Sequence, residues 1–161
     1  MPAFLRHALG ALTFALVASA PAHAQTMAAP SDDGLIKVRS AYSMEETIAR
    51  IKGDVAAKGI RWFQAVDQSR LAADAGIALR PSTLLEFGNP PLGAQFMTSN
   101  PYAGLDWPVR VLVLQDEAGV VWAAYTDFAW IARRHHITDR QPQFTMASGV
   151  VESITSTIKS R

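Results

Sequence analysis

VRVLVLQDEAGVVWAAY, residues 109–125, is the stretch of sequence that decides the fold. Two apolar runs, 109–114 and 120–125, flank the turn-forming segment Asp116 to Gly119. Apolar runs of this length around a short Asp- and Gly-containing turn are typical of a β-hairpin. The segment therefore predicts two adjacent antiparallel strands.

Similar patterns predict further strands before this hairpin, over 35–39, 60–66 and 82–87. The clearest helix begins at Ser43, because Glu46 lies three residues later and the pair forms a capping box. It ends near Gly59, where glycine supplies the usual C-terminal stop.

Helical spacing also predicts a short helix near 69–75, a helix after Asp127 and a last helix opening at Pro142. The predicted order is β-α-β-β-β-β-α-α. This order indicates an α+β fold with a mainly antiparallel sheet, helices on one face and an extra C-terminal helix.

Residues 88–108 are dense in Pro, Gly and Asn, and little regular structure is expected there. Loops of this length inside a compact domain are usually functional or broken by short helical turns. This segment is therefore the first place to seek a site.

The first 24 residues combine a basic start at Arg6, an apolar run over 9–20 and small residues around His23. This pattern predicts a signal peptide over 1–24, cleaved after Ala24, and a periplasmic or secreted protein. Residues 25–33 are expected to form a flexible lead-in. After cleavage no remaining apolar run is long enough to span a membrane.

The composition excludes several classes of function. The whole chain carries 15 basic and 14 acidic residues, which gives no field to attract nucleic acid. There is no cysteine, so disulfides, thiolate metal sites and thiol catalysis are absent. Only His135 and His136 lie outside the predicted signal peptide, too few imidazoles for a typical zinc site. No cofactor or metal is expected.

Four ordered motifs resemble a known family. They are LRPSTLLEFGNP over 79–90, Asn100-Pro101 with 105–108, the hairpin ending in Tyr125, and Arg134-His135. Together they are similar to the DUF302 family, also called TT1751-like, over about residues 34–137. Residues 138–161 are interpreted as a C-terminal extension with a helix.

The resemblance implies a compact β-α-β(4)-α domain and no particular reaction, because the family is named for having no known function. Members of the family commonly carry a histidine after an aspartate in the second strand region. This chain has Asp67-Gln68 there, so the resemblance does not transfer a role for that imidazole.

The polar residues in the family-like motifs are the candidate ligand-binding residues: Arg80, Asn89, Asn100, Tyr125 and His135. One hypothesis gathers them in a single pocket, with Arg80 as a bidentate donor to a small anion. The alternative interpretation is structural. Asn-Pro pairs start turns, and Asp106 caps or braces the loop.

Three functions stay open at this point. The first is a non-enzymatic protein that binds an unknown small ligand or protein in the periplasm. The second is a small enzyme in which His135 acts as acid or base and Asp106 orients it; a separation beyond about 6 Å would exclude it. The third is a self-associating structural domain, in which the last helix packs either on its own sheet or across the two-fold axis of a homodimer.

Overall fold

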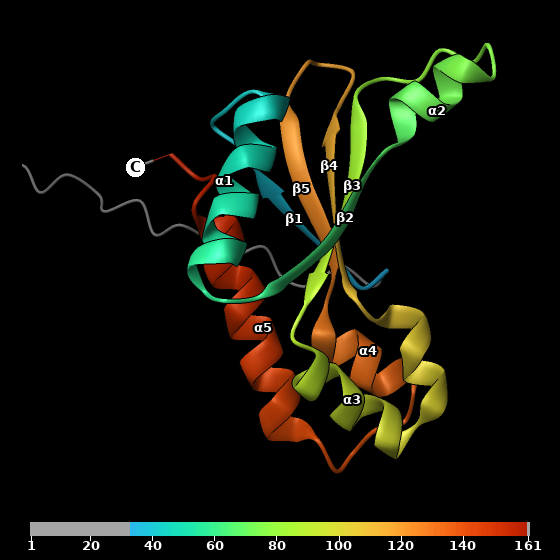
Figure 1. Ribbon diagram of the computed structural model, residues 1–161, viewed down its shortest axis with the longest axis vertical. Helices are drawn as coiled ribbons and strands as arrows, with labels where there is room; N and C mark the ends of the chain where they lie inside the picture. The colour runs from blue at the N-terminus through green and yellow to red at the C-terminus, as the bar shows by residue number, and fades with distance from the viewer. Residues whose placement is uncertain (1–32, 161) are drawn as a thin grey trace, which may run out of the picture.

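The structure is a computed structural model that describes residues 33–160 (Figure 1). The predicted signal peptide and residues 25–32 of the lead-in lie outside the described residues. The elements in chain order are β1 (Leu35–Arg39), α1 (Met44–Ala57), β2 (Arg61–Asp67), α2 (Gln68–Asp74), β3 (Ser82–Gly88), α3 (Pro90–Ser99), the 3-10 helix η1 (Pro101–Asp106), β4 (Val109–Gln115), β5 (Val121–Thr126), α4 (Phe128–Arg134) and α5 (Gln141–Ser156).

The five strands form one antiparallel sheet in the order β1-β5-β4-β3-β2. The predicted β4–β5 hairpin lies in its middle. At the hairpin turn the Asp116 N–H donates to the Val120 carbonyl at 2.9 Å. Gly119 has φ 77°, a conformation that glycine adopts without a steric penalty. The predicted α+β class is confirmed.

Alternation along the strands divides the sheet into two faces. Val111 is fully buried and is aligned with Leu85 on one side and Tyr125 on the other. The neighbouring residue, Leu112, points to the opposite face and is half-buried. Figure 1 shows α1 and α5 along one side of the sheet, while α3 and α4 lie at one end of it and α2 at the other.

The start of α1 follows the predicted capping in part. The Ser43 hydroxyl accepts the Glu46 N–H at 3.2 Å, as in a capping box. The Glu46 carboxylate does not return to the Ser43 backbone, because it pairs with Arg50 at 2.8 Å. Gly59 follows the helix with φ 64°, as predicted for its end.

The segment 88–108 is more regular than predicted, since most of it forms α3 and η1. Asn89 caps α3, and Asn100 caps η1. Each is followed by proline at the first helical position, where the missing N–H costs nothing. The Asn-Pro pairs that the sequence analysis interpreted as turn signals are helix starts.

The last helix packs inside its own chain. Its apolar stripe of Phe144, Ala147, Val151 and Ile154 is buried, and so is Ile158 just after the helix. The Phe144 ring stacks on Phe96 of α3 with their centroids 4.3 Å apart. A dimer built on this stripe would have to open the core, so α5 is part of the domain.

Candidate functional site

The single pocket hypothesised from the sequence does not form, because its members lie at opposite ends of the sheet. Arg80 precedes β3, whereas Asn89 follows it. Seven residues of strand separate them by roughly 20 Å. Arg80 is exposed and pairs with Glu117 of the β4–β5 turn at 2.9 Å. It therefore cannot act with Asn89 on one small anion.

The two asparagines have structural partners. The Asn89 side-chain oxygen accepts the Leu92 N–H at 3.3 Å, and that of Asn100 accepts the Tyr102 N–H at 2.9 Å. The Asn100 amide also donates to the His135 carbonyl at 2.9 Å. These bonds are helix caps and a tie between η1 and the end of α4.

Asp106 and His135, in contrast, do meet. The His135 Nε2 atom lies 2.6 Å from a carboxylate oxygen of Asp106, and each side chain is only 5% exposed. Arg134 and Arg110 reach the same carboxylate at 3.2 and 3.3 Å. We call these four residues the Asp106 cluster. The spacing satisfies the hydrogen-bond reach that an acid–base pair requires.

There is little space beside this cluster. The adjoining cavity has a volume of about 20 Å³ and is bordered by Asp106, Arg110 and Phe128. Such a cavity accommodates about one water molecule. His135 caps the end of α4, and the next residue, His136, has φ 52°. Within residues 33–160, no group of three or more His, Cys, Asp or Glu side chains is arranged to hold a metal ion.

Tyr125 lies on the covered face of the sheet and is 6% exposed. Burial raises the pKa of the Tyr125 phenol, and a hydrogen bond with Thr155 of α5 partly offsets that rise. Both interactions are typical of a core tyrosine that joins a strand to a helix. The phenol does not line the larger cavity described next.

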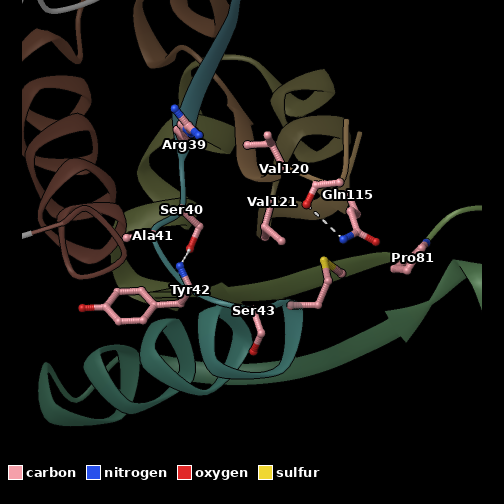
Figure 2. Close-up of a pocket in the computed structure, with 11 residues that line it drawn as sticks. Arg39, Ser40, Ala41, Tyr42, Ser43, Pro81, Gln115, Val120 and Val121 are labelled. Carbon is pink, nitrogen blue, oxygen red and sulfur yellow. Dashed lines mark hydrogen bonds between the residues drawn. The ribbon is translucent and has the colours of Figure 1, made fainter. Parts of the chain in front are cut away.

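A second cavity, wide open to solvent and with a volume of about 530 Å³, lies at the opposite end of the sheet (Figure 2). We call it the β1–α1 cavity. Its lining comes from three separate parts of the chain: residues 39–44, Pro81, and Gln115 with 119–121.

Hydrogen bonds fix the wall of the β1–α1 cavity. The Ser40 N–H donates to the Val121 carbonyl at 2.8 Å, and the Ser40 and Thr47 hydroxyls are 2.6 Å apart. The Ala41 N–H donates to the Ile158 carbonyl at 2.9 Å. The loop between β1 and α1 is therefore tied to β5, to α1 and to the segment that follows α5, and these bonds hold the wall of the cavity in place.

Apolar atoms provide most of the surface of the cavity. The Gln115 amide donates to the Gly119 carbonyl at 3.0 Å. Arg39 forms no ion pair with any residue in the described range. The Trp122 indole N–H is the main group that holds the pKa of Asp116 below its usual value, and the positive charge of Arg39 lowers that pKa further. The cavity thus offers an apolar body with a cation at its edge.

No motif in the sequence marks the residues that line this cavity. One local signal was present, because Ser40 and Ser43 lie in a loop between a strand and a helix, where binding residues often occur.

Asp67-Gln68, where members of the family commonly have Asp-His, has a structural role in this chain. Asp67 caps α2, and the Gln68 side chain accepts the Ser82 hydroxyl at 2.8 Å.

Comparison with known sequences decides the family. The sequence model of the family described as "Domain of unknown function DUF302" matches residues 36–160. The chain belongs to the DUF302 family. The match runs through α5, so the similarity to DUF302 includes the C-terminal helix that the motifs alone left outside.

The crystal structure of an uncharacterized conserved DUF302 protein from Bacillus stearothermophilus has the same fold. The TM-score is 0.71 at 16% sequence identity, with 78% of this chain and 98% of that chain covered. At this identity the likeness concerns the fold alone.

This chain matches part of longer curated relatives. The chain is 40% identical over 111 residues to proteins named "Fluoride-specific ion channel FluC 1" from Brucella suis and Brucella abortus. The aligned part is 69% of this chain but only 44% and 41% of those relatives. The chain thus spans less than half of their length. In residues 33–160, no helix has both the length and the apolar character to cross a membrane.

Proposed function

We propose that this DUF302 chain is an exported binding protein of the periplasm that holds a small ligand in the β1–α1 cavity. The observation that carries the proposal is the cavity itself. Its volume of about 530 Å³ lies within the range of roughly 300–1,000 Å³ typical of small-molecule sites. The hydrogen bonds of Ser40 and Ala41 preform its wall, which lowers the entropy lost on binding.

The lining favours a small organic molecule with an apolar body and one polar or anionic end. Met44, Val120 and Val121 provide apolar surface for the body. Arg39 provides the donors for the other end, because the Gln115 amide already donates to the Gly119 carbonyl. We assign no role in binding to Arg80 or His135, because their side chains are engaged elsewhere.

Native mass spectrometry of protein purified from the periplasm tests the proposal. We expect a bound small molecule that is released on denaturation. Val120→Trp should remove it by filling the cavity, whereas Arg80→Gln, outside the lining, should retain it. An apo mass for the wild-type protein, or equal retention by Val120→Trp, would rule out this site.

Export is tested separately. The basic, apolar and small-residue regions of residues 1–24 support it. Fusion of these residues to alkaline phosphatase, which is active only outside the cytoplasm, should give activity and a mature chain starting at Gln25. An inactive fusion would contradict the export proposal while leaving the cavity proposal standing.

A second candidate function is favoured by the 2.6 Å contact between His135 and Asp106. In this case His135, oriented by Asp106, acts as the general acid or base, and the adjoining cavity, which Asp106 borders, holds the attacking water. His135→Gln should then abolish turnover of a hydrolysable substrate without changing ligand retention in the β1–α1 cavity. Unchanged turnover in that variant would remove the candidate.

The relatives provide a biological setting for the binding function. We propose that the domain acts alongside fluoride transport, since their name refers to a fluoride-specific channel and more than half of each relative lies outside the match. A deletion strain should be sensitive to sodium fluoride but not to sodium chloride. Wild-type protein should restore growth and Val120→Trp should not; equal growth of all strains would contradict the link.

A further inference from the structure

The segment 67–80 carries three of the exposed large apolar side chains of the described chain. We call it the α2 arm; Figure 1 shows α2 at the far end of the sheet from α3 and α4. Leu71 is 59% exposed, Ile77 61% and Leu79 50%. No residue of α2 is buried, and every residue from 73 to 80 is exposed.

The arm is joined to the rest of the domain near its two ends, where the Gln68 side chain accepts the Ser82 hydroxyl and Arg80 pairs with Glu117. The bonds within the arm are local. The Asp67 carboxylate accepts the Arg70 N–H at 2.9 Å and the Ser69 hydroxyl at 2.6 Å. Gly76, with φ 74°, ends the turn after the helix. A seven-residue helix is marginal in water without tertiary packing, so α2, which has no buried residue, would gain stability from a covering surface.

The charges on α2 are self-complementary. Arg70 and Asp74 lie one turn apart on the helix, and Leu71 lies within about 100° of both. Neither charged side chain forms an ion pair with another residue in the part of the chain that the structure describes. When two copies of α2 pack antiparallel about a two-fold axis, each Arg70 faces the other copy's Asp74, and the two Leu71 side chains meet beside them.

We infer that the α2 arm is the surface through which two copies of this chain pair about a two-fold axis. The dimer interface is then the arm and not α5, whose apolar stripe is buried within its own chain. The arm leads directly into Pro81, which lines the β1–α1 cavity, so pairing would fix one wall of that cavity. The inference does not depend on the proposed ligand.

Sedimentation equilibrium over a concentration series tests the inference on the full secreted protein. Leu71→Asp should raise the dimer Kd at least about 100-fold, or about 2.8 kcal/mol, because the change occurs in both copies. Met146→Asp is the matched control, since Met146 is also 59% exposed but lies on α5. Circular dichroism establishes that each variant is folded.

A charge exchange separates this geometry from other modes of association. Arg70→Asp and Asp74→Arg should each weaken the dimer at least about tenfold, and the double variant should recover most of the loss. Recovery supports antiparallel pairing of α2. The inference is overturned if the wild-type protein sediments as a monomer at every concentration. It is also overturned if the protein binds a different protein while remaining monomeric. A dimer that Leu71→Asp leaves unchanged overturns it as well.

Discussion

Replacement of Asp106 by alanine should destabilise the protein by about 2–4 kcal/mol. The buried bond to His135 contributes roughly 1.5–3 kcal/mol, because one partner is a carboxylate removed from water. The side chains of Arg134 and Arg110 are 43% and 45% exposed, so solvent screening limits each of these pairs to about 0–1 kcal/mol.

Urea unfolding followed by tryptophan fluorescence measures this loss. With an m value of roughly 1–3 kcal/mol per molar urea, a loss of about 3 kcal/mol lowers the midpoint by about 1–3 M. Arg134→Gln removes one half-exposed partner and should cost less than about 1 kcal/mol.

Two results would refute this reasoning. If Asp106→Ala changed the free energy of unfolding by less than about 1 kcal/mol, the cluster would not be a stabilising network. If Arg134→Gln cost as much as Asp106→Ala, the exposed arginine pair and not the buried His135 bond would dominate. A double-mutant cycle of Asp106→Asn with His135→Gln measures the coupling between those two side chains directly.

Two further predictions concern packing and pH. A Cβ atom at Gly93 would lie 2.0 Å from the Trp107 ring, so Gly93→Ala should cost about 1–3 kcal/mol in thermal unfolding. Gly53→Ala in α1 meets no atom within 4 Å and should instead stabilise by about 0.5–1 kcal/mol; the reverse order would be inconsistent with the packing. The Trp122 bond lowers the pKa of Asp116 from its ordinary value of about 3.9. The stabilisation by ionised Asp116 is present above that value and is lost as pH falls through the folded pKa. Between pH 5 and pH 2 the melting temperature of the wild type should therefore fall more than that of Asp116→Asn.

The strands and α1 were predictable because their signals are local. The β4–β5 hairpin needs only two apolar runs and a turn, and α1 needs only Ser43 at its start and Gly59 at its end. The prediction of little regular structure over residues 88–108 was wrong because an Asn-Pro pair can begin either a turn or a helix. Asn89 and Asn100 start helices here, since each asparagine side chain accepts a backbone N–H of the first turn, and the proline that follows has no N–H to satisfy.

The candidate sites were less predictable because they depend on distant segments. Asp106 and His135 are 29 positions apart and meet only because β4 and β5 reverse the chain between them. The β1–α1 cavity combines a loop near Ser40, the start of β3 and the hairpin turn. No spacing within one segment encodes such a combination.

The two ends of the sheet differ in how their polar groups are used, and this difference bears on where a ligand can bind. At the end near α4, Asn89, Asn100 and Asp106 are already bound to the backbone or to charged neighbours. A ligand there would have to break these bonds, and it would find space for about one water molecule. At the other end Arg39 has no ion pair in the described range and borders a cavity large enough for an organic molecule. The residues that the family-like motifs make conspicuous therefore hold the fold together, and binding is expected where polar groups are still available.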